Sequence, residues 1–174
     1  MAFFDTDEFL VLDHRLHLRE LLSLRSACAA IVVPWAMFGS SGHRRRPSGL
    51  VIENYLHRSP DTFGPNRHVK TISKPERIIK FENPHVPEID GNFSDLLGNV
   101  AIFERPGLLE FAPDYTIGKL NHYFTRSWED WLLKISRGYH GGLRDIFEFE
   151  SYDLNEIYDD SAARLIPLVH KILS

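Results

Sequence analysis

The sequence predicts an α/β fold, because apolar runs typical of buried strands alternate with a stretch of helical periodicity. The first apolar run surrounds the acidic segment Asp5-Thr6-Asp7-Glu8, and residues 29–36 form a second run rich in Ala, Ile and Val. Between them, residues 14–27 place several leucines at helical spacing. A third run follows over residues 50–57, and the order strand, helix, strand, loop, strand is how α/β sheets are built.

The opening segment is interpreted as a buried strand that carries Asp5 and Asp7 to its carboxyl end. Residues i and i+2 of a strand share a face, so the two carboxylates can converge on one point. Paired carboxylates suit Mg²⁺ or Mn²⁺, especially a cation that also holds substrate phosphates. We therefore expect a metal site at this end of the strand.

The next elements follow in order. Asp13 is placed to cap the helix predicted over residues 14–27. In the strand predicted over residues 29–36, Pro34 suits an edge or a strand end. A loop over residues 38–49 then leads to the strand predicted over residues 50–57.

The middle of the chain is less regular, because residues 58–115 hold most of the ten prolines. We expect short strands over residues 69–72 and 77–81, a loop over residues 83–98, and a weaker strand over residues 99–103. A long irregular stretch in a compact domain often covers a site.

Regular structure returns with a strand predicted over residues 116–124. Ser127-Trp128-Glu129-Asp130 has the form of a capping box, which predicts a helix to about Ser136, and Gly138 suits its C-terminal cap. Residues 153–173 predict one or two amphipathic helices interrupted at Pro167. We expect one domain over residues 1–150 and a helical extension over residues 151–174.

Composition limits the functional class. With 174 residues, 43% hydrophobic and 12% aromatic, the chain is long and apolar enough for a folded core. A net charge of −4 gives no reason to expect a nucleic-acid partner, and the single cysteine, Cys28, excludes an internal disulfide. No apolar run approaches the roughly 20 residues that span a bilayer, and no signal peptide precedes the acidic segment. We expect a cytoplasmic protein, with peripheral attachment to a membrane as the alternative.

A set of short segments, in a fixed order, resembles a known family. The segments are residues 4–10 (Phe-Asp-Thr-Asp-Glu-Phe-Leu), 35–43, 49–53, 69–72, 85–87, 121–127 and 134–138. Together they resemble the second half of glycosyltransferase family 92 and its bacterial family-2-like relatives, over roughly residues 3–140. Each segment alone is a weak signal, and the ordered set is more specific.

The resemblance implies a GT-A fold, with a mixed sheet flanked by helices. It also implies transfer of a sugar from a nucleotide-sugar donor to a glycan or polysaccharide acceptor, as in capsule and surface polysaccharide synthesis. Such a domain places its nucleotide-binding half before the acidic strand. We therefore expect this chain to lack that half, which a missing N-terminal region or a partner chain would supply.

The resemblance also implies roles for individual residues. Asp7 would bind the divalent cation, Mn²⁺ or Mg²⁺, directly, and Asp5 would contact the ribose or a metal-bound water. His122 would complete the metal shell. Lys134 and Arg137, three residues apart on one helix face, would contact the diphosphate.

The residue that deprotonates the acceptor hydroxyl is not fixed by these arguments. Glu8, His43 and Glu53 are the candidates. Two other classes stay open: a haloacid-dehalogenase-like phosphatase with Asp5 as nucleophile and Asp7 as acid–base, and a non-catalytic carbohydrate-binding module.

Overall fold

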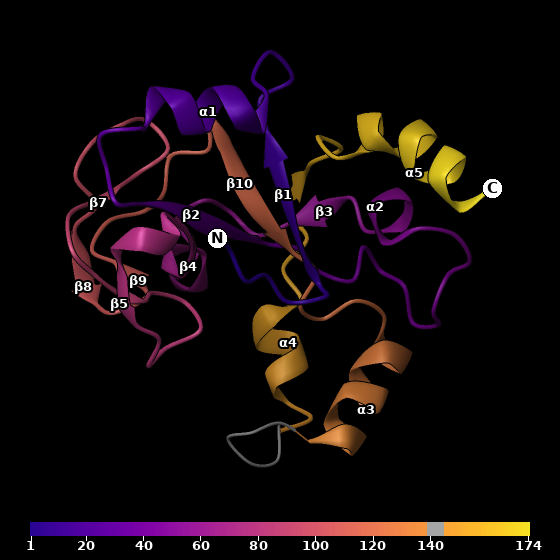
Figure 1. The fold of residues 1–174 in the computed structure, drawn as a ribbon. Helices are drawn as coiled ribbons and strands as arrows, with labels where there is room; N and C mark the ends of the chain where they lie inside the picture. Colours follow the sequence, from indigo (N-terminus) through magenta and orange to yellow (C-terminus); the bar gives the residue numbers. More distant parts are fainter. Residues whose placement is uncertain (139–144) are drawn as a thin grey trace. The chain divides into compact units, whose positions relative to one another are not determined.

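The computed structural model describes residues 1–138 and 145–174, which form an α/β fold with a mixed sheet and helices (Figure 1). The chain divides into two compact units. The first contains Met1–Ala36 and Asp61–Asn121, and the second contains Met37–Pro60 and His122–Ser174. The chain therefore contributes two separate segments to each unit.

A mixed sheet forms the centre of the first unit. Its strands run in the order β1 (Glu8–Leu12), β10 (Gly118–His122), β2 (Ala30–Met37) and β4 (Val69–Ser73), as Figure 1 shows. Strand β2 pairs antiparallel with β4 and parallel with the short strand β7 (Phe93–Ser94), so both directions occur in one sheet. The last residues of β2 and β10 belong to the second unit.

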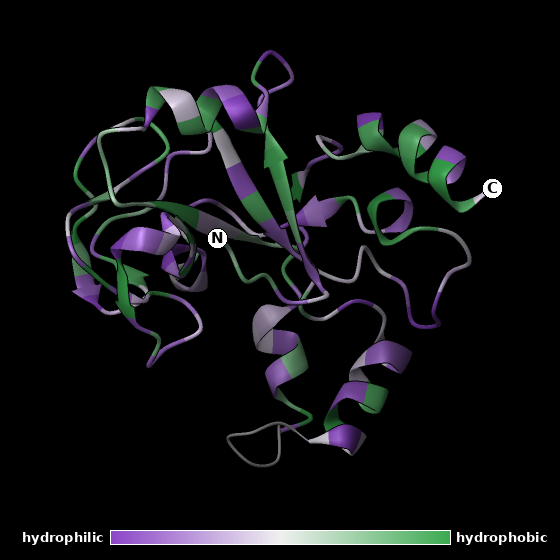
Figure 2. Cartoon of the chain, viewed as in Figure 1, coloured by the Kyte–Doolittle hydropathy of each residue, from purple (hydrophilic) through white to green (hydrophobic). Residues whose placement is uncertain are grey.

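The core of the first unit lies between this sheet and helix α1 (Leu18–Leu24). Leu21 of the helix is fully buried in a cluster with Ile31, Val33 and Leu120. Burial of almost every β2 residue explains why that strand is a continuous apolar run, whereas β1 begins hydrophilic and continues hydrophobic (Figure 2). The structure confirms the predicted helix, shortened at both ends, and the predicted strand over residues 29–36.

Short elements make up the rest of the first unit. They are the 3₁₀ turns η1 (Gly64–Arg67) and η2 (Pro75–Arg77), the antiparallel pair β5 (Ile78–Lys80) and β6 (Glu88–Ile89), and the antiparallel pair β8 (Phe103–Arg105) and β9 (Leu108–Leu109). The strands predicted over residues 69–72 and 77–81 are confirmed as β4 and β5. The strand predicted over residues 99–103 is wrong except at Phe103, where β8 begins.

The second unit is built from short helices around aromatic side chains. Its elements are α2 (Val51–Asn54), β3 (His57–Arg58), α3 (Trp128–Arg137), α4 (Glu148–Tyr152), β11 (Ile157–Tyr158), η3 (Ala163–Leu165) and α5 (Ile166–Leu173). Phe38 and Tyr123 lie 4.7 Å apart between ring centroids, and fully buried Trp131 lies 6.0 Å from Phe149. Strand β11 pairs antiparallel with β3.

Helix α3 begins and ends where the sequence predicts. Ser127 is its N-cap, and the Ser127 Oγ accepts a hydrogen bond from the Asp130 backbone N–H at 3.1 Å. Gly138 ends the helix with a φ of 66°, a left-handed conformation that favours glycine. Local capping chemistry alone was sufficient to predict this helix.

The strand predicted over residues 50–57 is wrong at its centre, where the chain forms helix α2. Glu53 accepts a hydrogen bond from the Leu50 backbone N–H at 2.7 Å, and the Glu53 backbone N–H donates to the Leu50 carbonyl at 3.1 Å. These two contacts close a helical turn. A short apolar run does not distinguish strand from helix, and here the side chain at the third helical position decides.

The position of the acidic segment is also corrected. Strand β1 begins at Glu8, so Asp5 and Asp7 precede the strand instead of ending one. The Glu8 backbone N–H donates to the Asp5 carbonyl at 3.0 Å, which closes a turn. Asp favours turns over strands, because its short polar side chain bonds to nearby backbone. The shared strand face expected for the two carboxylates is therefore absent.

Two smaller predictions differ from the structure. Helix α1 takes His17 as its N-cap, and Asp13 instead accepts bonds from the Arg15 backbone N–H and the Arg15 Nε, each at 2.9 Å. Within residues 153–173, β11 replaces the first expected helix, and Pro167 lies in the first turn of α5, where its missing N–H costs nothing. The division at residue 150 stays a prediction.

Within the described part of the chain, none of the helices combines the length and the apolar character needed to cross a bilayer.

Candidate functional site

Two hydrogen bonds between Asp5 and Glu8 close the acidic turn before β1. Besides the backbone bond that closes it, Glu8 Oε2 accepts the Asp5 backbone N–H at 2.9 Å. This second bond directs the Glu8 side chain back toward the start of the turn. Glu8 and Asp5 are thereby brought close to the same cationic group on the neighbouring part of the first unit.

That cation is Lys70, whose side chain is 2% exposed on β4. Its Nζ lies 2.9 Å from Asp5 Oδ2 and 3.6 Å from Glu8 Oε2. Asp5 is 66% exposed, whereas the Glu8 side chain is fully buried. The buried ammonium is therefore balanced by one carboxylate inside the unit and one at its surface.

Glu8 combines burial with an incomplete set of hydrogen bonds. Burial raises the pKa of the Glu8 carboxyl, and the Asp5 backbone N–H and the Lys70 charge oppose this rise. Its Oε1 is buried and has no hydrogen-bond partner within residues 1–138 and 145–174. A buried carboxyl with a raised pKa and an open acceptor atom is a candidate for proton transfer.

Two histidines with fixed ring orientation belong to the same unit. His85 Nδ1 donates to the Val69 carbonyl at 3.0 Å, and His68 Nδ1 donates to the Pro65 carbonyl at 3.1 Å. Burial lowers the pKa of both imidazoles. Trp35 stacks on His68 with centroids 5.0 Å apart and contacts His85 edge-on at 5.3 Å.

Sequence reasoning gave no role to Lys70 or His68. The available signal was a lysine inside the apolar segment over residues 69–72, directly after a histidine. A lysine in a strand of this kind is rarely buried without a carboxylate partner. Such a lysine needs a carboxylate partner, and Asp5 and Glu8 of the acidic turn are its partners.

The predicted site residues are distributed over both units. Asp5, Asp7 and Glu8 lie in the first unit, and His43, Glu53, His122, Lys134 and Arg137 lie in the second. Within the first unit, the structure brings Asp5 and Glu8 together at Lys70, and Asp7 lies in the turn between them.

The three residues expected at the metal shell and the diphosphate make local contacts in the second unit. His122 is 5% exposed, and its ring lies edge-on to Phe124 at 5.4 Å. Lys134 Nζ donates to the Phe124 carbonyl at 2.8 Å and lies 4.1 Å from the centroid of that ring. Arg137 is exposed, and its Nε donates to the Leu133 carbonyl at 3.2 Å.

The other two candidate bases hold local structure. Glu53 bonds to the Leu50 backbone N–H through one oxygen and to His170 Nε2 at 2.7 Å through the other, and these bonds lower its pKa. His43 Nε2 donates to the Asn54 carbonyl at 3.1 Å. Of the three candidates, Glu8 therefore has the environment best suited to accept a proton.

Within residues 1–138 and 145–174, no group of three or more His, Cys, Asp or Glu side chains is arranged to hold a metal ion. No family model and no curated protein matches the sequence. The candidate site therefore depends on its own geometry: an acidic turn, a buried lysine, a buried glutamate with an open oxygen, and neutral histidines in the same unit.

Proposed function

We propose that the chain is a metal-dependent glycosyltransferase, or a large part of one, that transfers a sugar from a nucleotide-sugar donor to a glycan or polysaccharide acceptor of the capsule or surface type. The observation that carries the proposal is the acidic turn, whose exposed carboxylate is held by a buried lysine beside a buried glutamate. Perturbed ionisable groups cluster at functional sites. The ordered segments that resemble family 92 and the GT-A fold give this cluster its chemical meaning.

In this proposal, the turn supplies carboxylate oxygens to a divalent cation. Mg²⁺ and Mn²⁺ prefer carboxylate oxygens and are often held by one or two carboxylates together with substrate phosphates. Asp7 is the proposed direct ligand, and Asp5, whose Oδ2 accepts a hydrogen bond from Lys70 Nζ at 2.9 Å, is proposed to contact the ribose or a metal-bound water. A bound cation would neutralise the charge that develops on the leaving nucleoside diphosphate.

The proposed reaction is a direct displacement at the anomeric carbon of the donor sugar. The acceptor hydroxyl oxygen attacks the anomeric carbon, and the bond from that carbon to the diphosphate oxygen breaks with its electron pair on the diphosphate. Glu8 Oε1, the buried acceptor atom without a partner, takes the hydroxyl proton. Direct displacement of this kind inverts the anomeric centre.

Manganese binding by the full chain tests the proposal. Titration with Mn²⁺, followed by calorimetry or electron paramagnetic resonance, is expected to give a site that Asp7→Asn weakens at least tenfold. Asp90→Asn is the matched control, because Asp90 is an exposed aspartate of the same unit paired with Arg77. A Mn²⁺ affinity that is equal in the two variants would contradict the assignment of the metal site.

The same variants separate the alternatives. A non-catalytic carbohydrate-binding module predicts no Mn²⁺ site that depends on Asp7. A phosphatase predicts a phosphoaspartate analogue at Asp5 with beryllofluoride. A phosphatase of this class would also use an acidic pair late in the chain, for which Asp159 and Asp160 are the candidates. Arg58 Nε holds Asp159 Oδ2 at 2.6 Å, and both side chains are nearly buried, so Asp159 is less available.

Donor turnover completes the test. The full chain is incubated with Mn²⁺, a panel of nucleotide sugars and an oligosaccharide acceptor, and released nucleoside diphosphate is measured. We expect the protein to release nucleoside diphosphate and Asp7→Asn to abolish this release. Glu8→Gln is expected to lower kcat and to change KM less.

A further inference from the structure

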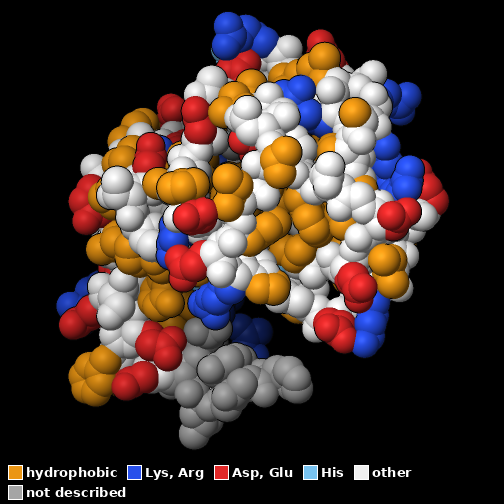
Figure 3. Space-filling model, turned by 90° about the vertical axis from the view of Figure 1, so that its left-hand side faces the viewer, with side chains coloured by type: hydrophobic (Ala, Val, Ile, Leu, Met, Phe, Trp, Pro, Cys, Tyr) orange, Lys and Arg blue, Asp and Glu red, His pale blue; other side chains and the backbone are white. Residues whose placement is uncertain are grey.

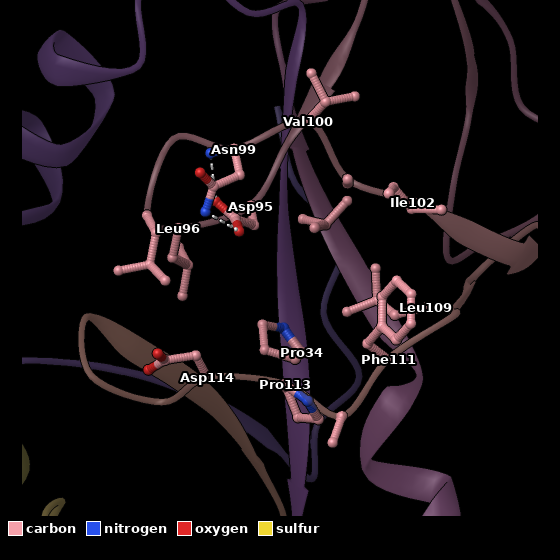
Figure 4. A pocket seen from close by; sticks show the side chains of 14 residues that line it. Pro34, Asp95, Leu96, Asn99, Val100, Ile102, Leu109, Phe111, Pro113 and Asp114 are labelled. Atoms are coloured by element: carbon pink, nitrogen blue, oxygen red, sulfur yellow. Dashed lines mark hydrogen bonds between the residues drawn. The ribbon is translucent and has the colours of Figure 1, made fainter.

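The first unit also contains a cavity whose lining includes no residue of the acidic turn. The cavity has a volume of about 260 Å³, and Val32 and Pro34 of β2 are among its lining residues; Figure 4 labels Pro34. Residues 95–102 and 109–114 form its two walls. The lining is mostly aliphatic side chains and proline, with one aromatic ring, that of Phe111.

The mouth of the cavity exposes apolar side chains to solvent. Val100 is 70% exposed, Ile102 53% and Phe111 64%. Figure 3, which shows the side of the molecule where β5, β8 and β9 lie in Figure 1, has hydrophobic side chains gathered in its middle with acidic groups among them. Apolar surface that surrounds a cavity and stays in water is typical of a binding site.

The charged groups of the cavity have one sign. Asp95 and Asp114 line it, and no Lys, Arg or His of the described chain does. Figure 4 shows these two carboxylates on one side of the cavity and Ile102, Leu109 and Phe111 on the other. The cavity therefore has an acidic side and an apolar side.

The two carboxylates have different hydrogen-bond partners within the protein. Asp95 Oδ1 accepts the backbone N–H groups of Gly98 and Asn99 at 2.7 and 2.8 Å, and Asp95 Oδ2 accepts Asn99 Nδ2 at 3.0 Å. Asp114 bonds to the Thr116 side chain and accepts the Thr116 backbone N–H at 2.7 Å, and these bonds lower its pKa. Asp114 is therefore ionised at neutral pH.

We propose that this cavity binds an organic cation with an apolar body, a primary alkylamine or arylalkylamine, whose ammonium group meets Asp114. Charge excludes an anionic ligand such as the diphosphate of a nucleotide sugar, because the carboxylates would repel it. The scarcity of polar lining groups disfavours a sugar ring, whose hydroxyls would lose their hydrogen bonds on burial. An apolar chain gains from the aliphatic walls and from the Phe111 ring, and an ammonium at the acidic side gains from Asp114.

A set of three eight-carbon ligands tests the charge assignment. Octylamine, octanol and octanoate have the same chain and differ in their head group, and binding to the full chain is measured by NMR titration below micelle-forming concentrations. We expect the amine to bind about two- to fivefold more tightly than the alcohol, the gain of an exposed ion pair, and octanoate to bind least. Hexylamine is expected to bind more weakly than octylamine, by about fourfold for each methylene removed.

Variants locate the site. Asp114→Asn keeps the acceptor oxygen for Thr116 and is expected to abolish the preference for amine over alcohol while leaving octanol affinity unchanged. Phe111→Ala is expected to weaken all ligands, and Asp90→Asn, an aspartate outside the lining, to change none. Circular dichroism checks that each variant is folded.

Any of three outcomes overturns the proposal: octanoate binds as tightly as octylamine, the preference for amine survives Asp114→Asn, or no eight-carbon ligand binds. In the last case, sedimentation of the full chain and of Phe111→Ala shows whether a second copy of this chain covers the cavity instead. None of these measurements depends on Mn²⁺ binding or sugar transfer, so failure here and failure of the proposed function can be told apart.

Discussion

Lys70 and Glu8 are two buried charged residues whose side chains are at most 2% exposed, and they lie 3.6 Å apart in the first unit. Each would be costly alone, because a buried charge without a partner loses its hydration and gains nothing in return. Asp5 adds a third charge at the surface. The stability of this cluster therefore depends on all three residues, whatever reaction it supports.

Replacing Lys70 is expected to destabilise the protein strongly. Lys70→Met leaves Glu8 buried without its cation, and loss of one partner of a buried pair costs about 3–5 kcal/mol. Lys80→Met is the control, since Lys80 is 60% exposed and paired with exposed Glu82, and it is expected to change stability little. Urea unfolding measures both variants, and equal effects would show that Lys70 is not the buried counter-ion described above.

His68 makes the stability of the first unit sensitive to pH. Burial lowers the pKa of folded His68 below its ordinary value of 6.5, so the unfolded chain takes up a proton that the folded chain resists. Stability is therefore present above pH 6.5 and is lost as the pH falls below it.

Urea unfolding at pH 7 and pH 5 checks this sensitivity. His68→Gln, which can still donate to the Pro65 carbonyl, is expected to lose less stability between the two values than the natural protein. His14→Gln, at a side chain that is 71% exposed, is the control. A pH dependence unchanged by His68→Gln would contradict the assignment.

At this scale the sequence identified the acidic turn but not its partners. Asp5, Asp7 and Glu8 were found because adjacent carboxylates are visible in any sequence. Lys70 was missed because its ion pair joins residues 65 positions apart. The bridge between Ala2 and Ile72 brings the start of the chain beside β4, and sequence spacing does not encode it.

Among the elements, helix α3 depends on one capping residue. Ser127 is fully buried, and its Oγ both accepts from the Asp130 backbone N–H and donates to Asp130 Oδ2 at 2.8 Å. Ser127→Ala is expected to cost about 1–2 kcal/mol, measured by thermal unfolding. Ser136→Ala, which removes an exposed hydroxyl of the same helix, is the control. Equal losses would mean that the cap contributes no more than an ordinary surface hydroxyl.

Gly39, which follows β2, has no room for a side chain. A Cβ built there would lie 2.5 Å from the Leu154 carbonyl oxygen, closer than any real contact. Gly39→Ala is therefore expected to cost about 1–3 kcal/mol, as overpacking does. Gly64→Ala, where a Cβ would meet nothing within 4 Å, is the control. Chemical unfolding compares them, and a neutral Gly39→Ala would contradict the close packing of residues 39 and 154.

Elements with a strong local signal were predicted well, and elements decided by context were not. Strand β2 and helix α3 followed from an apolar run and from a capping sequence. Helix α2 was predicted as strand because its apolar run has no pronounced period, and the bond from Glu53 to Leu50 decided it. The turn at Asp5 was missed for a similar reason, since Glu8 closes it with a side chain.

For the whole molecule, the sequence predicted the α/β class but not the exchange of segments between two units. Residues 37–60 belong with residues 122–174, and residues 1–36 belong with residues 61–121. Such a division depends on long-range packing. Local patterns, which report one stretch at a time, contain no information about it.

A shortened chain tests this division. In a chain of residues 1–121, residues 37–60 lack their partners, because the His43 and Arg44 carbonyls normally accept the Trp128 and Glu129 backbone N–H groups. Trypsin is expected to cut this chain quickly at Arg44–Arg46 while the sheet of the first unit resists. In the full chain the same bonds should be cut slowly. Rapid loss of the whole shortened chain, or equal cutting rates at Arg44–Arg46, would contradict the division.

The interleaving of the two units also has a consequence for synthesis on the ribosome. Every residue of the first unit has been made once Asn121 has been added, whereas residues 37–60 must wait for the segment that begins at His122. Domains tend to fold in the order in which they are translated. A nascent chain at this stage would therefore expose Phe38, Ile52 and Tyr55, all buried in the finished protein, to solvent and to chaperones.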